Sequence, residues 1–210
     1  MYGPTILATF DRGKGPVELE LGVFKDEKAA AALFTSWIND GRVRKYLLLR
    51  PQTQTSEEEF IRGLAGNNDR VYWAIYADSR LVGGLEIFDI SRDNRNGEIG
   101  IMIGDKSTWG MGIASAAEAL VAEYAFENIV AGGLNKIIVR VLEGNERSRG
   151  ALENVGFREV GVWRKHHWAR GEWHDIWLGE LLREDWREVR EQAFKAAGIT
   201  SHNIYPGSDE

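Results

Sequence analysis

The sequence predicts a mixed α/β fold in which helices flank a twisted, mostly antiparallel sheet of about seven strands. Residues 71–77 and 81–90 alternate with the two-residue period of strands across a short polar break, which indicates an antiparallel pair. Further along, a strand-like run at 98–104, a helical stripe that begins at Ile113 and a strand-like run at 136–142 follow one another. Such a unit implies two parallel strands joined by a right-handed crossover helix.

The N-terminal part predicts one strand and two helices. A strand fits residues 17–24, and apolar side chains over residues 30–38 then recur at helical spacing. Ser56 and Glu59 have the spacing of a capping box, so we expect a second helix to begin at Ser56. The chain therefore opens in the order strand, helix, helix.

The C-terminal part predicts two more helices and a strand pair. Asn145 is a suitable N-cap for a helix that ends at Gly156, and the last helix is expected at 183–197. Residues after Gly198 have the character of a frayed tail. The strands of the predicted pair are residues 157–168 and 173–182, joined by a turn at Arg170 and Gly171.

The composition suits one compact domain. The chain has 210 residues, of which 43% are hydrophobic and 28% are charged, and this is enough to bury a sizeable core. No internal repeat or linker-like stretch marks a second unit. We therefore expect a single domain over residues 1–210, with its core at 17–186 and a tail at 198–210.

Charge and cysteine content exclude several classes of function. Lys and Arg number 26 against 32 Asp and Glu, and the resulting net charge of −6 repels phosphate polymers, so nucleic acid is not an expected partner. The absence of cysteine removes disulfides, thiolate nucleophiles and iron–sulfur clusters. Neither a leader segment nor an apolar run of about 20 residues occurs, so we expect no membrane partner and a cytoplasmic location.

The central motif is the stretch EIGIMIGDKSTWGMGIA, which runs from Glu98 to Ala114 and leads from a strand through a polar link into a turn and a long helix. Gly110 and Gly112 let a ligand approach the backbone, and the first amides of a helix lack internal partners, so a pyrophosphate fits there. An ordinary tight strand-to-helix turn is the alternative. No P-loop spacing occurs in the chain, and a dinucleotide-binding fingerprint would need a third glycine where Ser115 stands.

The chain resembles the GNAT acetyltransferases and, within them, the branch of ribosomal-protein N-acetyltransferases. The pyrophosphate loop of that family reads Gln or Arg, two residues, Gly, one residue, Gly or Ala. Gly112 and Ala114 match this loop, and Trp109 replaces its polar first residue. The resemblance covers residues 17–186, and the order of its motifs is more specific than any single motif.

Two later motifs support the resemblance. An Asn, a Ser three residues on and a Gly-Phe pair at a helix end are typical of the family, and they correspond here to Asn145, Ser148, Gly156 and Phe157. Near the C-terminus, RGEWHDIWLGELLREDW is similar to the paired strands of the branch with their terminal acidic residue and Trp. The resemblance implies the GNAT fold, whose parallel strand pair is splayed, and an acetyl-CoA cosubstrate.

The resemblance also implies where acetyl-CoA binds. The pantetheine arm would lie along residues 101–103 in the gap of the splayed pair, with the amide of Met102 facing the thioester carbonyl, and the amides of residues 109–115 would hold the pyrophosphate. Arg147 and Arg149 could reach the 3′-phosphate or simply face solvent. No metal is expected. The expected cofactor contacts are Ile101, Met102, Ile103, Trp109, Gly110, Met111, Gly112, Ile113, Ala114, Ser115, Asn145, Ser148 and Arg149.

Three side chains are candidates for proton transfer. An amine that attacks a thioester must lose a proton, and Glu98 at the start of the splayed strand is the candidate base, with an ion-paired or solvated carboxylate as the alternative. Many GNAT enzymes use a tyrosine seven residues after the motif Asn as the general acid, but Leu152 stands there in this chain. The resemblance then implies Ser148 as the acid, and the alternative is that Ser148 only caps its helix. His167 could be a base, and a structural role is its alternative. His166 and His167 face opposite sides of a strand, which disfavours a metal site.

The sequence therefore predicts an acetyl-CoA-dependent N-acetyltransferase in which a primary amine attacks the thioester directly. The acceptor stays open among a protein N-terminus, a peptide, a polyamine and a small-molecule amine. A non-catalytic or regulatory acyl-CoA-binding protein is the alternative that the missing tyrosine permits. The aromatic C-terminal strands and helix could support a homodimer.

Overall fold

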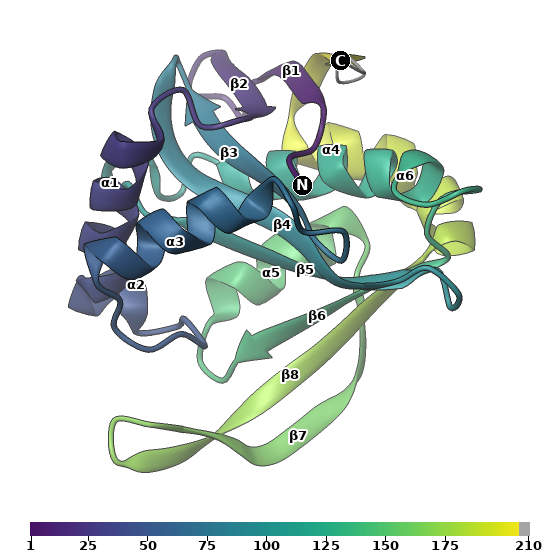
Figure 1. The fold of residues 1–210 in the computed structure, drawn as a ribbon. Coiled ribbons are helices and arrows are strands. Elements are labelled where there is room, and N and C mark those ends of the chain that lie inside the picture. Colours follow the sequence, from purple (N-terminus) through teal and green to yellow (C-terminus); the bar gives the residue numbers. More distant parts are fainter. Residues whose placement is uncertain (206–210) are drawn as a thin grey trace.

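A twisted sheet of nine strands runs through residues 1–205, which are the part of the chain that this computed structural model describes (Figure 1). The strands are β1 (Thr5–Phe10), β2 (Val17–Gly22), β3 (Val71–Ala77), β4 (Arg80–Ser91), β5 (Asn96–Ile103), β6 (Lys136–Leu142), β7 (Arg158–Ala169), β8 (Glu172–Leu182) and β9 (Ile199–Tyr205). The helices are α1 (Glu27–Asn39), α2 (Gly41–Arg44), α3 (Gln54–Leu64), α4 (Ile113–Asn128), α5 (Glu146–Val155) and α6 (Arg183–Ala197), with a 3-10 turn η1 (Lys106–Thr108).

The strands lie in the order β7-β8-β6-β5-β4-β3-β2-β1-β9. Neighbouring strands are antiparallel except for β5 and β6, which are parallel and are joined through α4. The mixed α/β class, the mostly antiparallel sheet and its one parallel pair are therefore confirmed.

The two faces of the sheet carry separate apolar cores. Helices α4, α5 and α6 cover one core, to which β5 and β6 contribute Ile99 and Val139, and helices α1 and α3 cover the other core, which includes Tyr72 (Figure 1). Side chains alternate along a strand, so β5 directs Ile99 toward α4 and Glu98 toward α1 and α3. A ligand lying between β5 and β6 would therefore meet both faces.

Strands β5 and β6 are paired over only a short stretch. Residues 96–98 of β5 face residues 136–138 of β6. Beyond this stretch β5 continues to Ile103 along β4, and β6 continues to Leu142 along β8. Beyond this stretch the backbone groups on the facing edges of β5 and β6 do not hydrogen-bond to each other, so they are free to bind a ligand.

The expectation of about seven strands leaves out β1 and β9 and is wrong by two. The frayed tail expected at 198–210 is wrong as far as Tyr205, because β9 pairs with β1, and residues 206–210 lie outside the described part. No position of β9 is fully buried, so its sequence lacks the apolar alternation of an inner strand. Backbone pairing with a strand at the other end of the chain forms β9, and the sheet extends past both ends of the expected core at 17–186.

Helix α3 begins earlier than expected. Thr53 is its N-cap: the Thr53 hydroxyl accepts a hydrogen bond from the Ser56 amide at 3.1 Å, and the Ser56 hydroxyl accepts one from the Thr53 amide at 3.0 Å. This is a capping box in which serine takes the place usual for Glu or Gln. The predicted start at Ser56, with Glu59 as its partner, is therefore wrong.

Ending the chain at Gly198 is expected to lower the unfolding temperature by several degrees, because β1 would lose the strand that pairs with it. Thermal denaturation followed by circular dichroism measures this. A variant with Ser201→Ala and Asn203→Ala keeps the backbone of β9 and changes only exposed side chains, so it should unfold at the wild-type temperature. An unchanged unfolding temperature in the shortened chain would contradict a stabilising role for β9.

Candidate active site

A cavity of about 1180 Å³ opens where β5 and β6 separate. Its wall includes Ile101 of β5, Val141 of β6, Ser115 of α4 and Leu152 of α5, and it continues to Phe60 of α3 beyond the other face of the sheet. This volume exceeds the range of about 300–1000 Å³ that is usual for small-molecule sites. A large ligand that enters from one face and a second ligand that enters from the other can therefore meet inside it.

The glycine turn forms one end of the cavity. Gly110 and Gly112 have φ values of +79° and +94°, in the left-handed region that side chains rarely adopt. Gly112 is the N-cap of α4 and provides no side-chain cap, so the first amides of this 16-residue helix are left for another acceptor. A Cβ at Gly112 would lie 2.4 Å from Cδ of Arg12, so this arginine crosses close to the turn. Open amides, a helix N-terminus and an arginine together suit a pyrophosphate.

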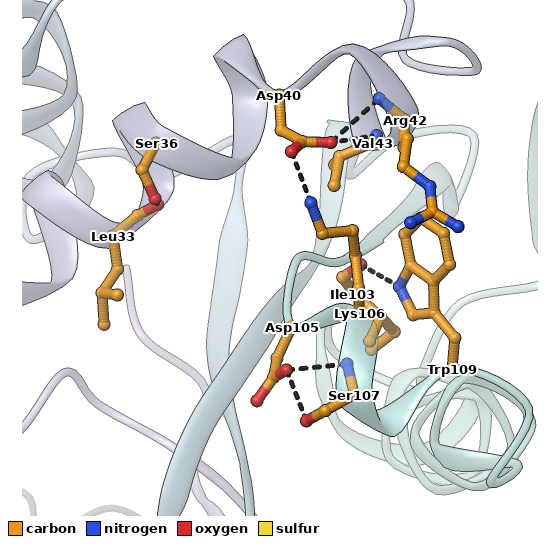
Figure 2. Close-up of polar contacts among 10 residues, drawn as sticks. All are labelled: Leu33, Ser36, Asp40, Arg42, Val43, Ile103, Asp105, Lys106, Ser107 and Trp109. Carbon is orange, nitrogen blue, oxygen red and sulfur yellow. Dashed lines mark hydrogen bonds and ion pairs between the residues drawn. The ribbon is translucent and has the colours of Figure 1, made fainter.

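Two side-chain contacts hold the turn in place (Figure 2). The indole Nε1 of Trp109 donates a hydrogen bond to the carbonyl oxygen of Ile103 at 2.8 Å, which joins the turn to the last residue of β5. Lys106 of η1 pairs with Asp40, whose other carboxylate oxygen accepts a hydrogen bond from the Arg42 amide at 2.9 Å and so caps α2. The Lys106 hydrogen bond lowers the pKa of Asp40. The start of α2 and the glycine turn are thus fixed relative to each other.

Glu98 lies at the last position where β5 and β6 are paired, and it is 7% exposed. Its Oε1 accepts a hydrogen bond from Nε of Arg140 on β6 at 2.7 Å. Burial raises the pKa of Glu98 above its ordinary value, while the hydrogen bond and the charge of Arg140 oppose this rise. The carboxylate is therefore ion-paired, which was the expected alternative to a role as catalytic base. It also lines the cavity.

Helix α5 brings a hydroxyl group to the cavity. Oδ1 of Asn145 accepts a hydrogen bond from the amide of Ser148 at 3.4 Å, so Asn145 makes the cap and the Ser148 hydroxyl does not. Ser148 lines the cavity. Leu152, at the position where many GNAT enzymes carry tyrosine, is 1% exposed and belongs to the apolar core. A hydroxyl donor on this helix is therefore available at Ser148 and not at Leu152.

The β7–β8 hairpin brings His166 and His167 to the cavity wall. His167 faces His174 in the strand register. Burial, followed by the charges of His174, His166 and Arg170, lowers the pKa of His167, so its imidazole is neutral at neutral pH. The buried His174 has its Nε2 3.2 Å from the carbonyl oxygen of Ala169, which suits a supporting role.

Most of the predicted contacts gather in the cavity, and two do not. Met111 packs against the core on the α4 side. Arg149 pairs with Glu153 outside the cavity, whereas Arg147 lines the cavity with its guanidinium 5.4 Å from the Trp109 ring centroid. The predicted residues that line the cavity are Glu98, Ile101, Met102, Ile103, Trp109, Gly110, Gly112, Ile113, Ala114, Ser115, Asn145, Ser148 and His167.

Sequence reasoning missed several residues of the cavity wall. Glu57 of α3 is 6% exposed, and burial raises its pKa. Its spacing from the buried Ile61 and Leu64 is the signal that could have found it, since all three lie on one stripe of α3. Tyr72 lies over Gly84, where an added Cβ would meet the Tyr72 hydroxyl at 1.9 Å. Arg12, Glu118 and Arg140 also line the cavity and were missed.

Glu118 is a charged residue type in the middle of the apolar helix α4. It is 1% exposed and lines the cavity, and its Oε2 has no hydrogen-bond partner within residues 1–205. Burial raises the pKa of Glu118 to about 8. An unpaired buried carboxyl group destabilises a fold, so its presence calls for a functional reason.

A family model described as acetyltransferase (GNAT) domain matches residues 18–158. The chain belongs to the GNAT acetyltransferase family. Two Bacillus subtilis (strain 168) proteins are similar to it. "Putative ribosomal N-acetyltransferase YdaF" is 35% identical over 109 residues, which are 52% of this chain and 57% of that protein. "Probable N-acetyltransferase YjcK" is 34% identical over 110 residues, which are 52% of this chain and 59% of that protein, so the match spans a little over half of each relative.

Solved structures share the fold of this GNAT chain. Mycobacterium smegmatis RimJ in complex with CoA-disulfide has a TM-score of 0.77 and 24% identity, covering 94% of this chain and 98% of that chain. Spermidine N-acetyltransferase from Vibrio cholerae in complex with CoA and spermine has a TM-score of 0.72 and 20% identity, covering 80% of this chain and 98% of that chain. The predicted GNAT fold is therefore confirmed.

The GNAT cavity fits the CoA that the family implies. The open amides after Gly112, the left-handed glycines and the Oε2 of Glu118, which has no partner among the residues that the structure describes, are features that a bound phosphate and a polar arm would satisfy. Within residues 1–205, no group of three or more His, Asp or Glu side chains is arranged to hold a metal ion. None of the helices in this same stretch combines the length and the apolar character needed to cross a membrane.

Glu118→Gln is expected to stabilise the ligand-free protein increasingly as the pH rises from 5 to 8. An unfolded Glu titrates near 4.5, whereas burial raises the pKa of Glu118 to about 8 in the folded protein. Between these pH values the folded state holds a proton that the unfolded state has lost. Rising pH therefore lowers the free energy of unfolding of the wild type by up to about 5 kcal/mol, whereas the amide variant has no such proton to lose. Chemical denaturation at a series of pH values measures the difference. Glu191→Gln, on the exposed side of α6, is the control and should keep the wild-type pH dependence. If Glu118→Gln also shows the wild-type pH dependence, the buried carboxyl with a raised pKa is contradicted.

Proposed function

We propose that this GNAT chain transfers the acetyl group of acetyl-CoA to a primary amine. The observation that carries the proposal is one cavity that leads from the open amides at Gly112, through the gap between β5 and β6, to the carboxylate of Glu98. One cavity thereby contains both a candidate anion site and a candidate acid–base group. The arrangement supports acyl transfer between two ligands that enter from opposite faces of the sheet.

Acetyl-CoA would supply an acetyl group that is already activated as a thioester. The amides after Gly112, together with Arg12 and Arg147 at the same end of the cavity, would bind its phosphates. The free edge of β5 at residues 101–103 would offer backbone groups to the amides of the pantetheine arm. These contacts would orient the thioester toward the acceptor face.

Glu98 is the residue that we assign to accept the proton of the amine. Burial raises its pKa and so makes it a stronger base than an exposed glutamate, while the hydrogen bond from Arg140 fixes its orientation. His167 is the second candidate, because it lines the same cavity and its lowered pKa leaves the imidazole neutral.

Ser148 is the residue that we assign to donate a hydrogen bond to the departing sulfur. Asn145 already caps α5, so the Ser148 hydroxyl is available, and Leu152 has no proton to give. A thiol titrates near 8.5, so its departure needs only modest assistance. A hydrogen bond from the Ser148 hydroxyl to the leaving thiolate is sufficient for this step, and the thiolate takes its proton from solvent.

The acceptor would enter on the face covered by α1 and α3. The carboxyl groups of Glu57 and Glu98 line the cavity here beside the rings of Phe60 and Tyr72. Carboxylates and aromatic faces both attract ammonium groups, which supports an amine acceptor. The names of similar proteins refer to ribosomal proteins and to spermidine, so a protein N-terminus, a peptide, a polyamine and a small amine are the acceptors to compare.

Gly112→Val should weaken acetyl-CoA binding at least ten-fold, because the side chain would strain the left-handed turn and meet Arg12 in the anion site. Isothermal titration calorimetry measures the affinity. Gly171→Val is the matched control: Gly171 has φ +83° in the hairpin turn, and no atom lies within 4 Å of an added Cβ, so binding should be unchanged. Equal affinities of the two variants would contradict the anion site.

The same preparation tests turnover through the release of free thiol from acetyl-CoA. The panel contains a ribosomal-protein N-terminal peptide, spermidine and a small primary amine. Thiol release with any one of them supports the transferase and names its acceptor class. Leu152 favours a non-catalytic acyl-CoA-binding role, and this role would be supported by tight binding without release on any acceptor. No binding by the wild type would overturn the proposal.

Glu98→Gln is expected to lower kcat roughly 100-fold or more while acetyl-CoA affinity stays near the wild-type value, because only the proton acceptor is lost. Arg140→Met should shift the acidic limb of kcat/KM to higher pH, since its hydrogen bond and charge hold the pKa of Glu98 down. Rates measured as a function of pH check both statements. If the acidic limb does not move in Arg140→Met, Glu98 is not the base, and a large rate loss in His167→Gln would then identify His167.

A further inference from the structure

Glu118 has surroundings that neither the fold nor the proton transfers explain. It lies in the second turn of α4, a helix whose other residues from Ile113 to Ala122 are apolar or small. Its side chain lines the cavity, and Oε2 has no hydrogen-bond partner within residues 1–205. The carboxyl group is therefore buried beside the space that the CoA arm would occupy.

The position of Glu118 along α4 corresponds to the middle of an extended ligand. Glu118 is six residues beyond Gly112, which is about 9 Å along the helix axis at 1.5 Å per residue. Ser115 lies one turn earlier on the same side of α4 and also lines the cavity. Ile99 of β5 and Val139 of β6 line the same cavity, and each comes directly after the last paired residues of the two strands. A ligand arm that runs from the glycine turn into the gap must pass Glu118.

Charged groups of the cavity do not compensate Glu118. Burial, and not a neighbouring charge, raises the pKa of Glu118. Glu98 and Arg140 belong to the opposite face of the sheet and neutralise each other. Arg12 and Arg147 lie at the glycine turn, and Arg147 stacks on a ring there. At neutral pH Glu118 is therefore mostly a carboxylic acid, which can donate and accept a hydrogen bond and does not repel the phosphates of CoA.

We propose that Glu118 is a cosubstrate-binding residue whose carboxyl group hydrogen-bonds to a polar group of the pantetheine arm of acetyl-CoA. The inference rests on the proposed function, because it requires that acetyl-CoA occupies the cavity. The arm carries a hydroxyl group and two amides between apolar carbons, so an apolar wall alone would leave polar groups of the arm unpaired. Glu118 supplies both a donor and an acceptor at the level where the strand edges begin to separate.

Calorimetric titration of two ligands into three proteins tests this assignment. Acetyl-CoA contains the pantetheine arm, and adenosine 3′,5′-bisphosphate is its nucleotide part, which lacks the arm and the second phosphate of the pyrophosphate. The proteins are the wild type, Glu118→Gln, which keeps a donor and an acceptor, and Glu118→Met, which has similar length and no hydrogen bond to give. We expect Glu118→Met to bind acetyl-CoA about ten-fold more weakly and Glu118→Gln to stay within about three-fold of the wild type. The bisphosphate should bind all three proteins equally.

The pH dependence of binding adds a second readout. Between pH 7 and pH 9 the Glu118 carboxyl loses its proton, so acetyl-CoA should bind the wild type progressively more weakly than it binds Glu118→Gln. The bisphosphate corrects for the titration of other groups, including Arg12, Glu98, Arg140, Glu146 and Arg147 around the cavity. A parallel pH dependence of acetyl-CoA binding in the two proteins would overturn the assignment.

The failures of the inference and of the proposed function are distinguishable. Equal affinity of the wild type and Glu118→Met for acetyl-CoA would overturn the role of Glu118 and leave the transferase proposal intact. Weakened binding of both ligands to Glu118→Met would also overturn it, because the substitution would then act on the fold of the anion site. If the wild type binds neither ligand, both proposals fall together.

Discussion

The early separation of β5 and β6 is the constraint on which the rest of the structure depends. Only three register pairs join these strands, after which each strand follows its other neighbour. Unpaired edges inside a sheet leave backbone groups without partners, and this is tolerated where solvent or a ligand takes their place. The long pairing of β5 with β4 and of β6 with β8 keeps the gap open, so the cavity is a consequence of strand register and does not rely on a mobile loop.

Helix α4 links this gap to the proposed anion site at Gly112. Its N-terminus begins at a left-handed glycine, while most of its length is buried against the sheet and against α5 and α6. The hydrogen bond from Trp109 to Ile103 and the pair between Lys106 and Asp40 fix the approach to the helix. A shift of α4 would therefore disturb the turn, the core and the cavity wall together, which explains how a buried carboxyl at Glu118 can be held in place despite its effect on stability.

Local signals made part of the site predictable from the sequence. Gly112 and Asn145 act within one turn of the helices that they begin, so their spacing was sufficient to predict the glycine start of α4 and the cap of α5, while the anion site stays a prediction. The partner of Glu98 is 42 positions away on another strand, and no local pattern indicates Arg140. Strand β9 depends on β1 at the other end of the chain, and its side chains carry no apolar alternation. Pairing between distant parts of the chain, not residue type, decides these two cases.

The two faces of the cavity treat their buried carboxyl groups differently. Burial raises the pKa of both Glu98 and Glu118, but only Glu98 has a cation, Arg140, to favour its charged form. Alternation along β5 and β6 puts this ion pair on the face away from α4, while no residue from Met1 to Tyr205 forms an ion pair with Glu118 on the α4 side. The ion-paired carboxylate of Glu98 on the first face can still accept a hydrogen bond or a proton from the proposed amine. An uncharged carboxyl on the second face does not repel the phosphates of the proposed cosubstrate, so the two faces of the sheet would meet the different electrostatic requirements of the two proposed substrates.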